Sequence, residues 1–398
     1  MPEVTEAVVA GRGQGTSVVA TVTGRPATRA LTLGVEEEFL LLDPTTGRVV
    51  PAAEEVRRRV AGPVEAWLVP EMTRFQLETN SAVHTDLRDL RRDLLEMRIV
   101  VAAAAQSAGV RLAACGTPLR GNPGLPPLSR CPRYHAIRRE FRGLTRGQGV
   151  CGCHVHVGIG DREEAVQVSN HIRPWLPVLQ ALTCNSPICD ALDTGYASWR
   201  AMVMSRWPSA EPPPFFRSAP HYDQIVSGLQ ASGAVLDRGM IYWLVRLSDH
   251  VPTLEFRAAD VCATVGETAV LAGLVRALAA TALSSVRAGV PAPAVDHSVL
   301  RAAYWRAARD SLEGEGLDLL SGVRMPAWRL VRMLVDHVRS SLEDTGDWTL
   351  VASGLARLRR RGSGAARQRA AFERRGHLPD VVDLLVRQTL ASPRELPC

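Results

Sequence analysis

The chain has 398 residues, is 46% hydrophobic and carries a formal net charge of +6, which predicts a globular protein with a substantial core and a mild attraction for anions. All 47 basic side chains are arginine, which excludes a Walker A phosphate loop, a pyridoxal phosphate Schiff base and a protein-kinase lysine. Neither a bilayer-spanning apolar run nor a signal sequence is apparent, and the eight cysteines form no dense framework, so we expect a cytoplasmic protein that does not contact membranes.

The first informative stretch is a strand predicted over residues 31–42, which follows a tail of residues 1–28 that we expect to be mobile. Alternation along this strand places Glu36 and Glu38 on one face, about 7 Å apart. Burying such a pair requires protonation, cationic neighbours or metal ions. Strict alternation sends Glu37 to the core face, where it needs a partner such as an arginine, or a local bulge.

A second strand with a polar face is predicted within residues 71–80, where Gln76 and Glu78 alternate with apolar residues. It is followed by the clearest helix in the sequence, whose apolar residues recur at steps of three and four from residue 87 to residue 101. Thr85 is predicted to cap this helix. Its apolar stripe should cover the back of the sheet.

A third polar-faced strand is predicted over residues 150–159, with His154 and His156 on one side and Cys151 and Cys153 on the other. The Cys-x-Cys-His-x-His pattern is typical of a zinc site, but thiols and imidazoles on opposite faces could not bind one ion. We therefore interpret the two cysteines as small core residues.

The rest of the chain adds one more polar-faced strand and a long helical region. In the later of two predicted strands, Glu255 and Arg257 share a face. The predicted elements, in chain order, are helices at 162–173 and 174–184, a substrate-side loop at 199–216, strands at 240–245 and 251–258, and helices from about 267 onward.

Four strands thus each present a polar face. Brought together in one antiparallel sheet, they would form a concave wall of carboxylates, imidazoles and an arginine. Such a wall attracts hard cations such as Mg²⁺ or Mn²⁺, and these ions in turn suit a polyphosphate ligand.

At these residues the sequence resembles the glutamate-cysteine ligase type 2 family of ATP-dependent carboxylate-amine ligases, within the glutamine-synthetase-like superfamily. The matching motifs run in order over most of the chain. They are Gly34-Val-Glu-Glu-Glu-Phe39, Glu71 with Gln76-x-Glu78, Gly152-Cys-His-Val-His-Val-Gly158, Thr194-Gly-Tyr-Ala-Ser198 with Arg200, Arg206-Trp-Pro208, Leu254-Glu-Phe-Arg257 and Gly362-Ser-Gly-Ala-Ala-Arg-Gln368.

The resemblance implies an α+β fold in which a curved, mainly antiparallel sheet forms a funnel with helices packed behind it. It also implies a single catalytic domain over residues 29–391, helical from about residue 267, followed by a C-terminal tail of residues 392–398.

The resemblance further implies the residues of the site. Arg257 would contact the transferring phosphoryl group, and Glu78 and Glu255 would be needed for turnover. Arg200 would bind the substrate carboxylate, because a planar guanidinium can do so with two hydrogen bonds. The other expected substrate-binding residues are Gln76, His156 and Tyr196, and the expected Mg²⁺ or Mn²⁺ ligands are Glu36, Glu38, Glu71, Glu78, His154 and Glu255.

The implied reaction joins a carboxylate to an amine. The γ-phosphate of ATP activates the carboxylate as an acyl phosphate, which the amine then attacks. We expect glutamate or a similar amino acid as the carboxylate donor, with weak glutamate-cysteine ligase activity. Thr117-Pro118 stands where many members carry a histidine before the proline, which leaves the amine open.

The residues also leave two other functions open. One is a metal- or nucleotide-dependent binding protein without turnover, and the other is a nucleic-acid binder using the arginines between Arg357 and Arg375. Only Phe372 lies near these arginines to stack on bases, so we interpret them as a solvated helix face or a contact for phosphates or acidic substrates, and expect no nucleic-acid partner. A homodimer is compatible with the sequence.

Overall fold

The polar-faced strands all belong to one seven-stranded sheet in which every pairing is antiparallel. The computed structural model describes residues 30–60, 62–121 and 126–391, so both predicted tails lie outside the described residues. The strand order is β2-β3-β1-β5-β9-β8, with β4 beside β1. The strands are β1 (Leu33–Leu42), β2 (Leu68–Pro70), β3 (Gln76–Asn80), β4 (Arg111–Ala113), β5 (Gly152–Gly158), β8 (Val245–Leu247) and β9 (Thr253–Asp260).

The register of the sheet brings the predicted polar residues next to one another. Glu38 of β1 lies opposite Glu78 of β3, and Glu36 of β1 lies opposite His154 of β5. Residues that are directly opposite in an antiparallel pair have their side chains on the same face. The central strand β1 therefore joins the acidic strand β3 to the histidine strand β5.

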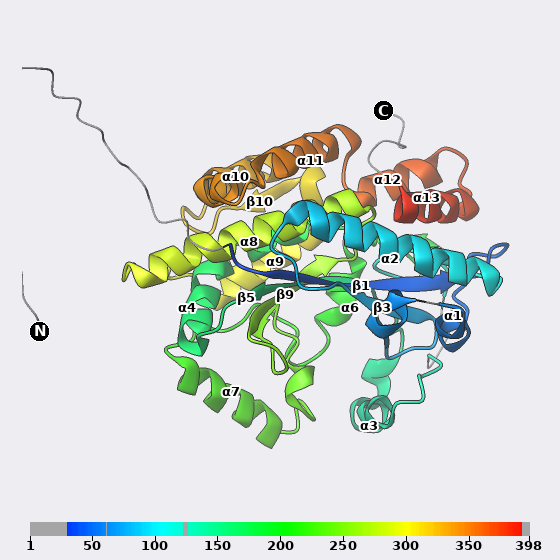
Figure 1. Cartoon of the computed structure of the whole chain (residues 1–398), viewed down its shortest axis with the longest axis horizontal. Coiled ribbons are helices and arrows are strands. Elements are labelled where there is room, and N and C mark those ends of the chain that lie inside the picture. Colours follow the sequence, from blue (N-terminus) through cyan, green and yellow to red (C-terminus); the bar gives the residue numbers. More distant parts are fainter. Residues whose placement is uncertain (1–29, 61, 122–125, 392–398) are drawn as a thin grey trace, which may run out of the picture.

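Helices cover the apolar face of the sheet. Figure 1 shows α2 (Leu87–Ser107) and α8 (Val265–Arg287) lying across that face, with α10 (Ala327–Asp344) and α11 (Trp348–Arg361) in an outer layer against α8. On the other side, α3 (Pro132–Phe141) and α7 (Ala219–Ala231) lie away from this helical layer (Figure 1). The remaining helices are α1 (Ala53–Arg59), α4 (Arg162–Ile172), α5 (Leu176–Thr183), α6 (Trp199–Met204), α9 (His297–Asp310), α12 (Gly364–Glu373) and α13 (Leu378–Leu390).

The helix α8 belongs to the core. It is the one helix among the described residues that is long and apolar enough to cross a membrane by length and composition, yet most of it is buried inside the protein. Its Arg276 is fully buried and forms an ion pair with Asp347, which precedes α11. Burial on nearly all sides is the environment of a core helix.

Glu37 has an arginine partner, which is one of the two solutions predicted from the sequence. Its carboxylate is fully buried and accepts hydrogen bonds from Arg98 of α2, at 2.9 Å from Nε and 2.6 Å from Nη2. Thr268 of α8 donates a third, at 2.7 Å. This ion pair joins the central strand to the two helices that cover it.

Three sequence predictions were wrong in detail. Asp86, not Thr85, caps α2, since its side chain accepts from the backbone N–H of Arg88. The predicted loop at 199–216 begins with the six-residue helix α6, which is capped by Ser198. The strand predicted at 240–245 is shifted to β8.

The shift of that strand has a local cause. The N–H of Leu244 bonds to the carbonyl of Glu211, while the carbonyls of Gly239 and Ile241 accept from the side chain of Arg246. These backbone groups therefore bond to partners outside the sheet. The apolar run at 240–244 fills the core without forming a strand.

Candidate active site

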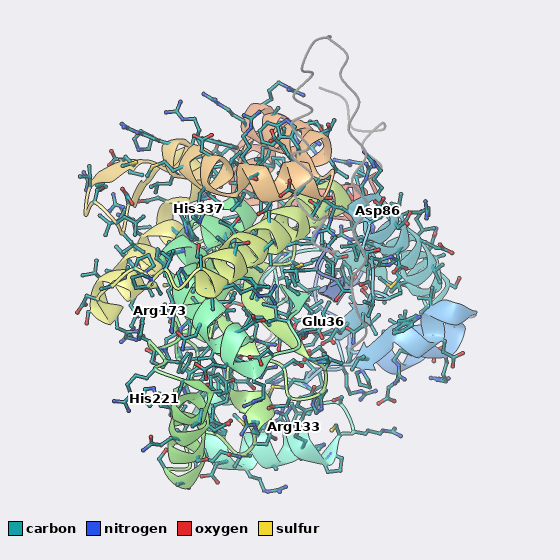
Figure 2. All side chains as sticks on the ribbon, turned by 60° about the vertical axis from the view of Figure 1, so that its left-hand side comes forward. Glu36, Asp86, Arg133, Arg173, His221 and His337 are labelled. Atoms are coloured by element: carbon teal, nitrogen blue, oxygen red, sulfur yellow. The ribbon has the colours of Figure 1, made fainter. Side chains whose placement is uncertain are left out.

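The polar face of the sheet lines a cavity on the side away from α2 and α8. Two of the residues that line it, Glu36 of β1 and Arg133 of α3, are labelled in Figure 2. Eight of the predicted site residues line this cavity: Glu36, Glu38, Glu71, Gln76, Glu78, His154, Arg200 and Arg257.

An acidic triad occupies one wall of the cavity. Glu38, Glu71 and Glu78 each offer a carboxylate oxygen, and the three oxygens lie within 4.8 Å of one another. Burial raises the pKa of Glu78 well above its ordinary value, and repulsion from the neighbouring carboxylates raises it further. Burial also raises the pKa of Glu38. A cluster of carboxylate oxygens that repel one another fits a hard divalent cation, which would remove the repulsion.

Glu36 is held between the two predicted histidines. Its Oε2 lies 2.9 Å from Nδ1 of His154 and its Oε1 lies 3.1 Å from Nε2 of His156. Burial by itself would raise the pKa of Glu36, but the two histidines outweigh burial and lower it. Burial and the charge of Arg257 lower the pKa of His154 and favour its neutral form. A neutral imidazole is the form that binds metal ions.

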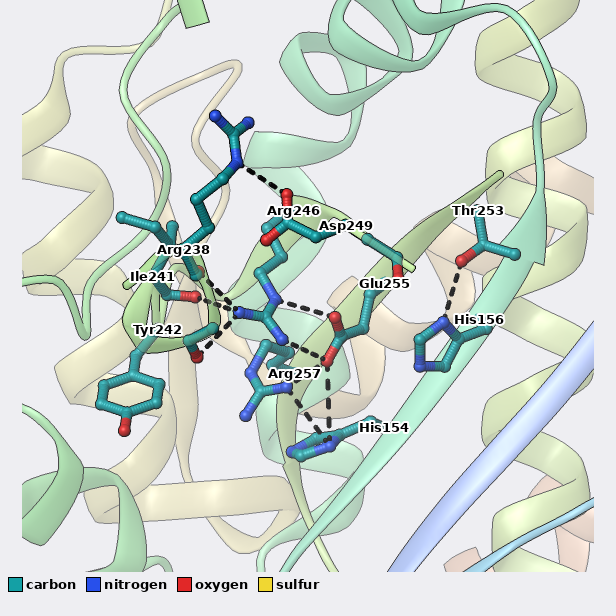
Figure 3. Close-up of polar contacts among 12 residues, drawn as sticks. His154, His156, Arg238, Ile241, Tyr242, Arg246, Asp249, Thr253, Glu255 and Arg257 are labelled. Carbon is teal, nitrogen blue, oxygen red and sulfur yellow. Dashed lines mark hydrogen bonds and ion pairs between the residues drawn. The ribbon is translucent and has the colours of Figure 1, made fainter. Parts of the chain in front are cut away.

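Glu255 is neutralised by two arginines in this structure. Arg246 donates from Nε to Oε2 at 2.8 Å and from Nη2 to Oε1 at 3.4 Å, and Nη1 of Arg257 contacts Oε1 (Figure 3). Burial opposes ionisation of Glu255, but the charges of the two arginines outweigh it and lower the pKa. One oxygen of Glu255 lies within 4.8 Å of ligand atoms of Glu36 and His156, so this group could also hold a cation.

Arg200 presents unused hydrogen-bond donors. The residue is 5% exposed, and its Nε has no hydrogen-bond partner among the residues that the structure describes. Its guanidinium packs against Gly152, where a Cβ atom would lie 2.3 Å from Nη2. A buried guanidinium with free donors beside a cavity has the chemistry to bind an anion such as a carboxylate.

Two cavity arginines were missed by the sequence analysis. Arg246 lies in β8 directly opposite Glu255, and alternation would have identified it had this strand been placed correctly. Its Nη1 also donates to the carbonyls of the turn before β8 (Figure 3). Arg133 of α3 forms two hydrogen bonds with Asp237, at 2.7 and 2.8 Å. The sequence analysis did not identify Arg133, because it did not predict the helix α3 that carries this residue.

Part of the cavity wall is aromatic: Trp207 lies in the predicted substrate-side loop at 199–216, whereas Tyr134 and Tyr242 were missed. Tyr134, Trp207 and Tyr242 line it, and the rings of Trp207 and Tyr242 meet edge to face with centroids 5.8 Å apart. The guanidinium of Arg257 lies over the ring of Tyr242, 6.0 Å from its centroid. Bulky apolar side chains of this kind exclude water from a site.

Three predicted substrate-binding residues either bond within the protein or lie outside the cavity lining. Gln76 lines the cavity, but its amide bonds to the carbonyl of Val150 and the hydroxyl of Thr73. His156 is outside the cavity lining, and its two ring nitrogens bond to Glu36 and to the hydroxyl of Thr253. Tyr196 lies outside the lining of this cavity, and its hydroxyl instead accepts a hydrogen bond from the indole of Trp305.

The cysteines that suggested a zinc site and the arginines that suggested nucleic-acid binding have structural explanations. Cys151 and Cys153 are fully buried, and no cysteine belongs to a potential metal cluster within the described ranges. In the C-terminal arginine cluster, Arg367, Arg369 and Arg375 form ion pairs with acidic side chains. The charges of these three arginines are therefore already compensated within the protein.

Comparisons with known proteins agree with this architecture. Two relatives named "Putative glutamate--cysteine ligase 2" come from Salinispora arenicola, 48% identical over 94% of this chain and 100% of the relative, and from Salinispora tropica, 49% identical over 89% and 95%. Among solved structures, a bifunctional glutathione synthetase from Pasteurella multocida matches with a TM-score of 0.68 at 16% identity, over 91% of this chain and 52% of that one.

A glutamate-cysteine ligase from Francisella tularensis, solved in complex with AMP, matches with a TM-score of 0.65 at 12% identity over 92% of this chain and 90% of that one. At these identities the solved structures show the fold alone, and they agree with the predicted α+β architecture built on a mainly antiparallel sheet. The model of glutamate-cysteine ligase family 2 matches residues 32–384, and the chain therefore belongs to this family.

Proposed function

We propose that the protein is an ATP-dependent carboxylate-amine ligase whose catalytic domain spans residues 29–391. The observation that carries this proposal is the pairing, in one cavity, of the acidic triad Glu38, Glu71 and Glu78 with the arginines Arg200 and Arg257. Carboxylates that can bind cations and guanidiniums that can bind anions are the two requirements of a site that aligns a nucleotide with a carboxylate.

The carboxylates and histidines in and beside the cavity fit divalent cations. Glu38, Glu71 and Glu78 would hold one Mg²⁺ or Mn²⁺, and the group of Glu36, His156 and Glu255, with His154 adjacent, offers ligand atoms for another. When bound, such ions neutralise charge on the phosphate oxygens of ATP. The mutual repulsion of the carboxylates supports this assignment.

The arginines would supply the remaining positive charge, because the chain has no lysine. Arg257 projects from β9 beside His154, and we assign it to the transferring phosphoryl group. Arg200 has unused donors at the cavity wall, and we assign it to the substrate carboxylate. Arg246 fixes Glu255 and the turn before β8.

The chemistry then needs no covalent enzyme nucleophile. A carboxylate oxygen of the substrate attacks the γ-phosphorus of ATP, ADP leaves, and the amine displaces phosphate from the resulting acyl phosphate to give an amide. The protein aligns two anions that repel each other and excludes water from the activated acyl group with its aromatic wall. We propose small-molecule substrates, with glutamate or a similar amino acid as the carboxylate donor, and a cytoplasmic location.

The test is a screen of amino-acid pairs and other small amines for ADP formation in the presence of Mg²⁺, with mass detection of the amide. We expect ADP release that depends on both the carboxylate and the amine, together with a product of the corresponding amide mass. Tight binding of nucleotide without turnover for any pair would contradict the proposal and would identify a binding protein instead.

A further inference from the structure

Asp260, the last residue of β9, is a fully buried carboxylate to which the reaction above assigns no role. It lies opposite Gly152 of β5. Simple alternation from Glu255 would send Asp260 to the other face of the sheet. However, β9 places three residue steps, from Phe256 to Ala259, against two steps of β5, which is a β-bulge. The bulge turns Asp260 to the side of the cavity.

The Asp260 carboxylate accepts hydrogen bonds from the two segments that hold the backbone of Arg200. Its Oδ1 accepts from the hydroxyl of Ser198 at 2.7 Å, and its Oδ2 accepts from the hydroxyl of Ser186 at 2.7 Å and from the N–H of Asn185 at 2.9 Å. Nη1 of Arg200 lies 3.8 Å from Oδ1. Each carboxylate oxygen is thus engaged, and the charge is balanced by one guanidinium.

Both serines in turn hold the backbone around Arg200. The hydroxyl of Ser198 accepts from the N–H of Ala201 and so caps α6, while the hydroxyl of Ser186 accepts from the N–H of Arg200 itself at 3.1 Å. Asp260 is therefore linked twice to the first turn of α6. One link runs through the hydroxyl of Ser198 to the N–H of Ala201, and the other runs through the hydroxyl of Ser186 to the N–H of Arg200. Gly152, which lacks a Cβ atom, leaves the space in which the guanidinium lies.

The geometry points to Asp260 as the positioning residue for Arg200: its carboxylate fixes the start of α6 and the guanidinium, so that the free donors of Arg200 face the cavity where the substrate carboxylate binds. This role rests on the proposed function for the identity of the ligand, but the placement of Arg200 itself does not depend on that function. The role accounts for a charged group buried at the end of the strand that also carries Glu255 and Arg257.

The test compares Asp260→Asn with Asp347→Asn, a matched change at another buried aspartate whose arginine partner, Arg276, is outside the cavity lining. With L-glutamate as the probe, Asp260→Asn should raise KM for the carboxylate at least about tenfold while KM for ATP stays within about twofold. Asp347→Asn should leave both KM values within about twofold. Equal KM values for wild type and folded Asp260→Asn would overturn the inference.

A second readout needs no turnover. Phenylglyoxal modifies exposed arginines, and peptide mapping by mass spectrometry reports Arg200 separately. Arg200 should be protected in the wild type and labelled several-fold faster in Asp260→Asn, while the exposed Arg92 is labelled equally in both. Unchanged protection of Arg200 would overturn the inference. If the wild type turns over no carboxylate, the proposed function fails, and the labelling still decides the role of Asp260.

If Asp260→Asn does not fold, Ser198→Ala is the second variant. It removes the hydroxyl that caps α6 and links Asp260 to the N–H of Ala201. It should produce the same selective rise in KM for L-glutamate and the same faster labelling of Arg200. A folded Ser198→Ala protein with wild-type KM and wild-type labelling would contradict the proposed link.

Discussion

The buried ion pair between Glu37 and Arg98 should contribute strongly to stability, and Arg98→Met tests this. Arg98 donates to both carboxylate oxygens of Glu37 and to the backbone carbonyls of Cys262, Ala263 and Thr389. Both side chains are fully buried. The substitution leaves a carboxylate in the core that, among the residues described by the structure, keeps only the hydroxyl of Thr268 as a side-chain donor.

Removing one partner of a buried ion pair costs about 3–5 kcal/mol, because the other charge stays buried without compensation. We therefore expect the free energy of unfolding, measured by urea titration with circular dichroism, to fall by about this amount in Arg98→Met. The double variant Glu37→Leu with Arg98→Met removes both charges and should recover much of the loss.

The control is Arg92→Met on the same helix. The Arg92 side chain is 74% exposed and pairs with Asp89 on the surface, so its loss should change stability by no more than about 0.5 kcal/mol. If Arg98→Met unfolds within about 1 kcal/mol of the wild type, the pair does not hold the sheet to its helices as described.

Two further predictions concern the cavity and the residues beside it. Glu78→Gln and Glu255→Gln should each abolish ADP formation while the circular dichroism spectrum stays native. Glu78→Gln should also raise Tm in the absence of metal, because it removes one of three carboxylates that repel one another. Wild-type rates in both variants would refute the site assignment. Gly152→Ala places a Cβ atom 2.3 Å from Nη2 of Arg200 and should lower kcat/KM at least about tenfold, whereas Gly160→Ala, whose Cβ would meet nothing within 4 Å, should have no effect. Equal activities of the two glycine variants would show that the position of Arg200 does not matter.

Much of the site could be predicted because alternation in strands is local. Once β1, β3 and β5 are recognised, the faces of Glu38, Glu78 and His154 follow, and their meeting in one sheet needs only antiparallel pairing. The need of Glu37 for a partner follows in the same way. Its identity as Arg98 depends on how α2 packs against the sheet, which alternation does not describe.

Other features depend on contacts that are distant in sequence. Arg246 was missed because its strand starts five residues later than the apolar run suggests, and Asp260 was missed because a bulge reverses the alternation near the end of β9. The aromatic wall comes from helix α3 and the loops around Trp207 and Tyr242, where no period indicates a shared cavity. Register irregularities and loop packing are set by tertiary structure, so they are not visible in a local pattern.

The central claim is that carboxylates from separate segments bind a divalent cation in one cavity. The most direct measurement is a Mn²⁺ titration followed by electron paramagnetic resonance, comparing the wild type with Glu78→Gln and with Glu96→Gln, which alters an exposed glutamate on α2. We expect the wild type and Glu96→Gln to bind Mn²⁺ alike and Glu78→Gln to bind at least about tenfold more weakly. Identical binding curves for all three proteins would contradict the claim.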